Sequence, residues 1–473
     1  MNLEEFAALV ATSSRRLPFR ISVVSLALLA AVVAMQFLPA SAAQAQGGND
    51  CNNANGNVQT CRTLPLPGNI VLGDSSAIYS SVGGHLDGNT TIAWKVEGEF
   101  PHATTVAFTG YDDFGLIPGA EYVLNDKDII PDKNSENPWI PGTPVNVENR
   151  SYTVWIWPDT VPVPKKLENV VLYPTVARDP EDERVRVSVV IRYYEMWPGI
   201  SPIREQPTVT RYDTSNLKRP LDCDGYSGLF GALALVDSFG RQVDVFGAGV
   251  PPQPWKVDKH SNKIAFSRIP AELVPVPEGY PADGAVNYLA AIVDASKIST
   301  LTLHRTGTFY NNQNLPWDAI FGEYEARYMS FVNQAQFPVR SSDVVNQNQA
   351  IYQDDGSWVT VVLPSLPQLS DGEVADVRAK AAELGYNVIG GGRYQPNVGL
   401  EPGLVAFRMQ RPADGFEGSN LNVPSWTEEG NNYSTYNEQS SDEFFETFTS
   451  TPHNMGEYWL DGVTETLKEF LDR

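Results

Sequence analysis

The sequence predicts a mainly β protein made of two jelly-roll-like or sandwich modules, with a small α+β element and a C-terminal helix. Short aromatic and β-branched runs, separated by Pro, Gly, Asn and Asp clusters, follow one another from Thr91 onward. Two such stretches repeat the same order of motifs, and helical periodicity appears only late in the chain. These features are typical of paired β-sheets.

The N-terminus has the profile of a signal peptide, assigned to residues 1–45. A basic stretch with Arg16 and Arg20 precedes an uncharged apolar run, and Ala43-Gln44-Ala45 fits the cleavage pattern. The arginines leave the Sec and twin-arginine routes open, and the apolar run also fits an uncleaved anchor. We expect a periplasmic or extracellular chain with no stable membrane insertion after the leader is cleaved.

Length and charge restrict the classes of function. Without its leader, the chain of 473 residues is still long enough for two or three domains. With 57 acidic and 34 basic residues its formal net charge is −23, and such a negative field repels phosphate groups. We therefore expect no nucleic acid partner, and a polysaccharide or a protein is the expected partner instead.

Three cysteines in an exported chain are expected to include one disulfide pair. Cys51 and Cys61 flank a short Asn- and Gly-rich loop after the leader, and we expect a bridge between them. This bridge would tie down residues 46–90, an N-terminal segment. Cys223 is left over, either as a free buried thiol or paired with another chain or with one of the first two cysteines.

The two β modules are assigned to residues 91–215 and 216–368. A strand from Val185 to Tyr194 alternates apolar and mostly polar residues, so that one face is buried and the other partly wet. The internal repeat rests on matching motifs that occur in the same order in the two modules. The first module has Gly98-Glu99-Phe100, Val106-Ala107-Phe108, Asp128-Ile129-Ile130 and 151–158; the second has Gly322-Glu323-Tyr324, 328–331, Asp343-Val344-Val345 and 357–364.

Residues 369–473 are expected to form the α+β element. Ser370 and Glu373 make a capping box for a helix that ends at Gly385, and a strand follows over 386–389.

A second helix is expected from Gly456 to Leu471. Trp459, Val463, Leu467 and Phe470 fall on one stripe at helical spacing. This helix would dock on a β face or bind a partner.

Five segments between residues 92 and 200 occur in an order that resembles a secreted bacterial family, number 1214 among the domains of unknown function. The segments are 106–113, 130–132, 137–139, 152–156 and 187–194. The family pattern has a strand like Phe-Thr-x-Tyr-Asp, an Asn-Trp loop and a last strand that ends Arg-x-Tyr-x-x-Pro; here Trp197-Pro198 follows slightly later than in that pattern. The resemblance implies a jelly-roll-like sandwich and supplies no catalytic residue.

His102 and Asp112 are the candidates for acid–base chemistry, because they lie about a strand length apart. The five histidines have no zinc-ligand spacing, and Gly225-Tyr226-Ser227-Gly228 lacks the last glycine of a nucleophile elbow.

An acidic loop offers hard oxygen ligands at near-alternate spacing, as calcium requires. Its residues are Asp126, Asp128, Asp132, Asn134 and Glu136. Calcium is the only cofactor that the sequence suggests, and the alternative is a solvated acidic loop.

Two groups of aromatic residues differ in their expected role. Trp155 and Trp157 share one face of a strand and are expected in the core, because the matching Val361 and Leu363 are aliphatic. Tyr193, Tyr194 and Trp197 are expected to be exposed and to bind a ligand, because their strand runs out into Pro198-Gly199.

The sequence thus favours a non-catalytic binding or structural protein of the cell envelope. The alternative is an extracytoplasmic, glycosidase-like hydrolase that uses a carboxylate pair on polysaccharide, but the sequence does not give the separation of the two carboxylates.

Overall fold

A computed structural model describes most of the chain beyond residue 60. It covers residues 61–63, 66–67, 77–111, 120–176, 184–197, 200–201, 205–221, 262–264, 266–268, 286–293, 296–306, 326, 328–335, 340–364, 369–390, 403–410, 416–417, 419 and 455–473. All of these belong to one compact unit, Thr60–Arg473. The predicted leader, Cys51, Asp112 and Cys223 lie outside the described residues.

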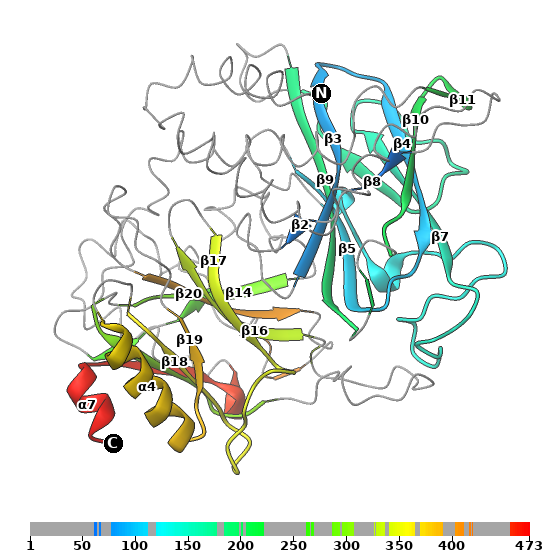
Figure 1. Ribbon diagram of the computed structural model, residues 1–473. Helices are drawn as coiled ribbons and strands as arrows, with labels where there is room; N and C mark the ends of the chain where they lie inside the picture. The colour runs from blue at the N-terminus through cyan, green and yellow to red at the C-terminus, as the bar shows by residue number, and fades with distance from the viewer. Residues whose placement is uncertain are drawn as a thin grey trace, which may run out of the picture. The chain divides into compact units, whose positions relative to one another are not determined.

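Residues 61–221, here called repeat 1, form a sandwich of two sheets (Figure 1). One sheet has the strand order β1-β10-β4-β7-β8, with β11 paired to β10, and the other has the order β2-β3-β9-β5-β6. The strands are β1 (Cys61–Arg62), β2 (Leu66–Pro67), β3 (Ala77–Asp87), β4 (Ile92–Glu99), β5 (Ala103–Tyr111), β6 (Val123–Asn125), β7 (Ser151–Pro158), β8 (Val170–Tyr173), β9 (Arg184–Met196), β10 (Thr208–Asp213) and β11 (Asn216–Leu221). Two 3-10 turns, η4 (Ala120–Tyr122) and η5 (Asp126–Asp128), flank β6.

Residues 262–473, here called repeat 2, form a second sandwich. Its sheets have the orders β12-β21-β15-β18-β19 and β13-β14-β20-β16-β17. The elements are β12 (Lys263–Ile264), β13 (Ser267–Arg268), β14 (Val286–Val293), β15 (Ile298–Leu303), β16 (Tyr328–Ala335), β17 (Arg340–Asn346), β18 (Trp358–Val362), α4 (Asp371–Glu383), β19 (Asn387–Ile389), β20 (Gly403–Gln410), η8 (Gly456–Tyr458), β21 (Leu460–Glu465) and α7 (Leu467–Leu471).

The two repeats have the same topology. Each strand from β1 to β10 corresponds to the strand numbered eleven higher, and the order within both sheets is unchanged. The sheets β1-β10-β4-β7 and β3-β9-β5-β6 are those of a jelly roll, which β2 and β8 extend at their edges. The predicted mainly β fold of two jelly-roll-like modules is confirmed.

Each sandwich has its own apolar core between its two sheets. In repeat 1, Val82, Trp94, Phe108, Val154 and Val187 come from five different strands and are almost fully buried. Each such side chain contributes about 1.5–3 kcal/mol through loss of its contact with water.

Repeat 2 is packed in the same way around a core of its own. This core contains Leu289, Leu301, Phe331, Trp358 and Phe407, again from both sheets.

Strand β9 shows how the sequence pattern sets the layers. Val185, Val187, Val189 and Ile191 point into the core as predicted, and Arg186 and Arg192 on the other face are half-buried. The neighbouring strand β3 carries Gly83 at a φ of 138°, where an added Cβ would lie 2.1 Å from the carbonyl oxygen of Val187. Only glycine permits this close approach of the two strands.

In both repeats one strand pair is parallel, and an asparagine secures it. The amide of Asn169 bonds the backbone N–H and C=O of Ile130, at 2.8 and 2.7 Å, and the carbonyl of Thr153 at 2.9 Å. Asn387 makes the same three bonds to Ile351, at 2.7 and 2.9 Å, and to Val359 at 3.0 Å.

These bonds test the predicted register of the repeat. Thr153 and Val359 hold the same place in the motifs 151–158 and 357–364, so this part of the predicted repeat is confirmed. The pairing of 128–130 with 343–345 is wrong, because Val344 and Val345 lie in β17, the counterpart of β6.

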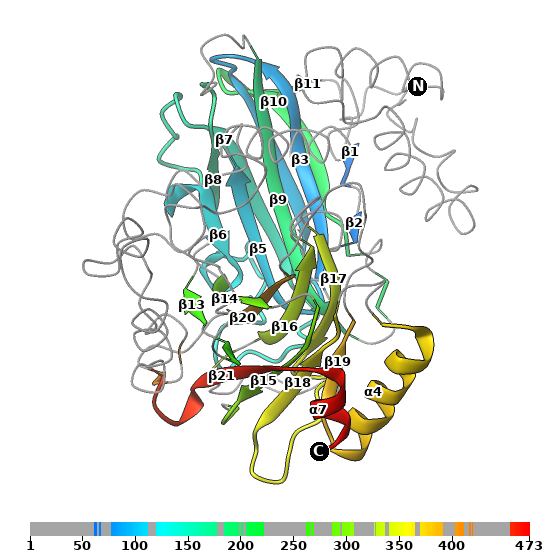
Figure 2. The same ribbon diagram turned by 90° about the vertical axis from the view of Figure 1, so that its left-hand side faces the viewer.

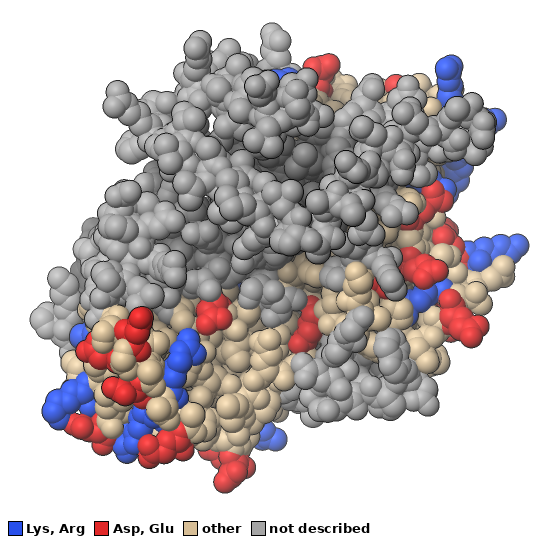
Figure 3. Space-filling view, in the orientation of Figure 1, with Lys and Arg blue, Asp and Glu red and all other residues tan. Residues whose placement is uncertain are grey.

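The parallel pairs differ in the crossover that joins them. In repeat 2 the crossover contains α4, which packs with α7 over Ile298, Val361 and Leu363 (Figure 2). Ser370 and Glu373 form the predicted capping box of α4. Acidic and basic side chains are intermingled on the outer surface of these helices (Figure 3).

In repeat 1 a loop replaces the helix. Val161 and Leu167 of this loop cover Trp155 and Trp157. None of the helices among the described residues is both long and apolar enough to cross a membrane.

Three predictions about the chain ends are wrong. The predicted segment 46–90 contains β3, a strand of the first sandwich, and the predicted region 369–473 contains β19, β20 and β21 of the second. The predicted helix Gly456–Leu471 is interrupted by β21, which pairs with β12 and β15; a 3-10 turn, η8, precedes this strand, and only Leu467–Leu471 is α-helical. Two neighbouring strand edges supply hydrogen bonds that outweigh the local helical pattern.

Candidate functional site

His102 closes one end of repeat 1 through hydrogen bonds from both of its ring nitrogens. Its Nδ1 lies 3.2 Å from Oε2 of Glu205, and its Nε2 lies 2.8 Å from Nη1 of Arg150. The backbone N–H of His102 donates to the same Glu205 oxygen at 3.1 Å. Because arginine can only donate, Nε2 accepts and the ring hydrogen on Nδ1 points to Glu205.

Arg150 is a buried cation in this end, with only 4% of its surface exposed. It also donates to the carbonyl of Val145 at 3.1 Å and to that of Pro101 at 3.2 Å. The imidazole of His102 thus connects a buried guanidinium with the carboxylate of Glu205, a geometry that compensates both charges.

The pKa of Glu205 reflects these contacts. Burial of the carboxylate opposes ionisation, but hydrogen bonds from the ring and backbone of His102 and the positive charge of Arg150 outweigh burial, and the pKa of Glu205 is lowered. Both ring nitrogens of His102 are engaged by these contacts, to Glu205 and to Arg150. Asp112, the predicted partner of His102, lies outside the described residues.

The predicted binding aromatics are buried, so the expectation that they are exposed is wrong. Tyr193, Tyr194 and Trp197 are 0%, 1% and 6% exposed. Strand β9 continues to Met196 between β3 and β5, which places Tyr193 in the core. Tyr194 faces the other way and meets the ring of Tyr328 in repeat 2 at 5.4 Å.

The predicted calcium ligands do not meet, so this prediction is wrong. Asp126 is fully buried and accepts from Thr105 Oγ1, from Val106 N at 3.3 Å and from Lys127 N at 2.6 Å. The carboxylate thus bonds β5 directly beyond the point where its partner strand β6 ends. Asp128, Asn134 and Glu136 are exposed and Asp132 is half-buried. Among the described residues, no group of three or more His, Cys, Asp or Glu side chains could hold a metal ion.

The predicted core position of Trp155 and Trp157 is confirmed. They are 9% and 1% exposed, and their counterparts Val361 and Leu363 are buried under α4 and α7. The predicted bridge between Cys51 and Cys61 stays a prediction, because Cys51 and the side chain of Cys61 are outside the described part. The backbone of Cys61 pairs with Val209.

The corresponding end of repeat 2 is open to solvent. There the imidazole of His304 stacks on the indole of Trp459, with ring centroids 3.6 Å apart and an interplanar angle of 9°. The N–H of His304 donates to the carbonyl of Trp459 at 3.0 Å, and its Nε2 lies 3.3 Å from Oδ1 of Asp461. The side chains of His304 and Asp461 are 34% and 44% exposed.

Charged side chains surround this stacked pair. Arg305 forms an ion pair with Glu457, and its guanidinium lies 5.4 Å from the ring centre of Tyr458. Asp355 lies in the adjoining turn, where hydrogen bonds from the side chain and backbone of Ser357 and the nearby His304 lower its pKa. We call His304, Arg305, Asp355, Glu457, Trp459 and Asp461 the loop-end cluster.

The loop-end cluster can bind a ligand that combines a flat apolar face with polar groups. The stacked rings present apolar surface, and the aspartates and Arg305 provide acceptors and donors at its rim. Its residues are far apart in the sequence, and helical spacing predicts Trp459 to lie in a helix. One sequence signal could have indicated the loop-end cluster: the pair Tyr458-Trp459 directly before the short alternating run 460–465.

The fold and the two loop ends define a duplicated jelly-roll protein. No family model matches the chain, and no curated protein matches it. The resemblance to family 1214 therefore stays a prediction.

Two solved structures are similar to the chain. An uncharacterized protein from Burkholderia cenocepacia is 13% identical, over 76% of this chain and 79% of that one, with a TM-score of 0.41. The VPA0106 protein from Vibrio parahaemolyticus is 9% identical, over 72% and 86%, with a TM-score of 0.31.

Proposed function

We propose that this protein is exported and binds a polysaccharide at the loop-end cluster of repeat 2 without cleaving it. The observation that carries the proposal is the stack of His304 on Trp459, which is half-buried at the end of a jelly roll and flanked by the more exposed Asp461. Sugar rings have apolar C–H faces and a rim of hydroxyls, and aromatic rings with carboxylates beside them complement both.

Three further features support a binding role. Jelly rolls serve as lectin domains, although a fold alone does not fix a function. The leader pattern of residues 1–45 favours a location outside the cytoplasm. The engagement of both His102 nitrogens leaves neither free to act as a general base, which supports binding over hydrolysis by His102; the carboxylate-pair alternative does not depend on this histidine.

The test uses the mature chain on a glycan array, followed by calorimetry with the best saccharide. Trp459→Ala is expected to weaken binding by roughly tenfold or more, since a central aromatic contributes about 2 kcal/mol to such an interface. His304→Ala is expected to weaken it as well, and His85→Ala, an exposed histidine in repeat 1, serves as the matched control.

The same chain is then incubated with a panel of polysaccharides to test for cleavage. Turnover of any of them contradicts the non-catalytic role. Binding only to a protein partner, or saccharide binding that Trp459→Ala leaves intact, contradicts the proposed site.

A further inference from the structure

Two tyrosine hydroxyls are buried at the closed end of repeat 1. Tyr152 on β7 and Tyr193 on β9 are 1% and 0% exposed. Among the described residues neither hydroxyl has a hydrogen-bond partner. A buried hydroxyl without a partner is costly, so each such group in a stable fold needs an explanation.

The two hydroxyls approach this end from opposite sheets. Tyr152 is paired with Gly98 on β4, and its hydroxyl oxygen would lie 3.0 Å from a Cβ added there, beside Pro207. Tyr193 lies between Ile78 and Val106 in the facing sheet, with its side chain in the same core.

Glu205, two residues before Pro207, lies at the same end. Burial raises the pKa of each tyrosine hydroxyl, and the charge of Glu205 raises both further; Tyr152 also raises the pKa of Tyr193. The contacts given above use only one carboxylate oxygen of Glu205, Oε2, which accepts from His102. Its side chain is 16% exposed, so Glu205 itself is in contact with solvent.

We propose that a bound water molecule bridges the hydroxyls of Tyr152 and Tyr193 and the carboxylate of Glu205. A water accepts two hydrogen bonds and donates two, so it can accept from both hydroxyls and donate to Glu205. A metal ion does not fit, because no group of three or more ligating side chains exists among the described residues. The water makes the closed end of repeat 1 a polar counterpart to the open end of repeat 2.

The test combines a crystal structure of the mature chain with a double-mutant cycle. The structure is expected to show a water about 2.8 Å from both hydroxyl oxygens. Tyr152→Phe and Tyr193→Phe are each expected to lower the midpoint of urea unfolding. The double variant is expected to unfold at a urea midpoint no lower than that of the less stable single variant, because loss of one hydroxyl already releases the shared water.

Tyr173→Phe is the matched control. The Tyr173 hydroxyl donates directly to the carbonyl of Ile92, so its loss is expected to add fully to that of Tyr193→Phe. A direct bond between the two hydroxyls with no water in the electron density overturns the proposal. Strictly additive losses for Tyr152→Phe and Tyr193→Phe, or single variants as stable as the parent, also overturn it.

Discussion

Individual polar residues in this protein are used mainly to hold loops at the ends of strands. Asn169 and Asn387 each satisfy three backbone groups, and Asp126 satisfies a strand N–H that would otherwise be buried without a partner. The sequence predicts Asp126 as a calcium ligand, because spacing alone does not distinguish a carboxylate that binds a metal from one that binds the backbone.

Glu205 is expected to make stability depend on acid pH. Its pKa in the folded chain is below its ordinary value of 4.5, so its contribution is fully present above that value and is lost as the pH falls through the lowered pKa. Glu205→Gln should therefore lower the free energy of unfolding near neutral pH. The difference in this free energy between the parent and the variant should become smaller as the pH falls below 4.5.

Urea unfolding of both proteins across this pH range measures the difference. Asp128→Asn, an exposed carboxylate away from the His102 contacts, controls for effects of acid pH on the whole chain. A difference between parent and Glu205→Gln that stays constant with pH would show that the His102 contacts do not stabilise the ionised form.

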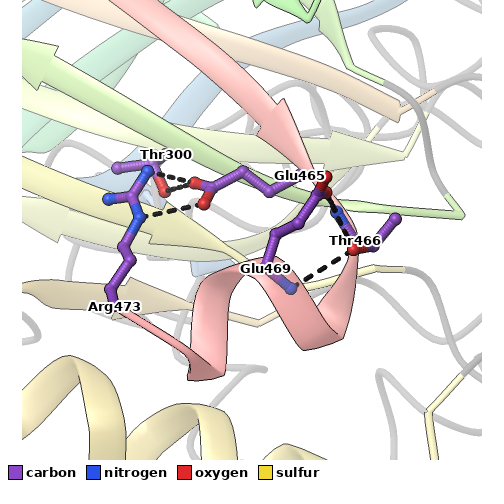
Figure 4. A network of polar contacts seen from close by, with 5 residues as sticks. All are labelled: Thr300, Glu465, Thr466, Glu469 and Arg473. Carbon is purple, nitrogen blue, oxygen red and sulfur yellow. Dashed lines mark hydrogen bonds and ion pairs between the residues drawn. The ribbon is translucent and has the colours of Figure 1, made fainter.

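At the scale of elements, α7 is joined to β21 by a small polar network (Figure 4). The carboxylate of Glu465 accepts from Thr300 Oγ1 at 3.0 Å, from Arg473 Nε at 2.9 Å and from Arg473 Nη2. Thr466 and Glu469 form the capping box that starts the helix. A helix of one turn is not stable alone, so these contacts and Phe470 in the core hold it in place.

Glu465→Gln is expected to lower the free energy of unfolding by about 1–2 kcal/mol, because it removes a charge-assisted pair whose carboxylate is largely buried. Chemical denaturation measures this loss. Lys468→Ala is the control, since its ion pair with Asp472 is exposed and is expected to contribute nothing measurable. Equal effects of the two substitutions would contradict the role of the network.

At the scale of the whole molecule, one pair of equivalent positions carries different side chains in the two repeats, and the side chain in repeat 2 makes a hydrogen bond to repeat 1. Asp126 and Gln347 are counterparts, because each directly follows an edge strand, β6 or β17. The side chain of Asp126 accepts a hydrogen bond from the N–H of Val106 at 3.3 Å, and that of Gln347 accepts one from the N–H of Met329 at 2.8 Å. Unlike a carboxylate, the amide of Gln347 also donates, and its Nε2 reaches Oε2 of Glu195 in repeat 1 at 3.3 Å.

Glu195 is adapted to this contact. It is 8% exposed, has a φ of 51° and also lies 3.4 Å from Thr104 Oγ1. A left-handed glutamate at a strand end is unfavourable by itself and persists only where its surroundings hold it.

Gln347→Glu is expected to destabilise the protein by about 2 kcal/mol, because a donor is lost and two carboxylates face each other in a buried site. Calorimetry should then show separate transitions for the two repeats. Glu195→Gln in the same chain should restore much of the stability, since the new pair can form a hydrogen bond. Gln349→Glu, in the same turn but exposed, is the control; a loss as large as that of Gln347→Glu would rule out the specific contact.

The sequence by itself determined the β class, the faces of β9, the cap of α4 and the repeated motif 151–158 with 357–364. These depend on alternation and capping, which act between neighbours in the chain. Tertiary structure alone decided that the terminal segment becomes β21 between two strands and that Tyr193 and Tyr194 are buried. It also brought His102 to Glu205 and His304 to Trp459, because strand pairing joins residues more than a hundred positions apart and no local pattern records the partner.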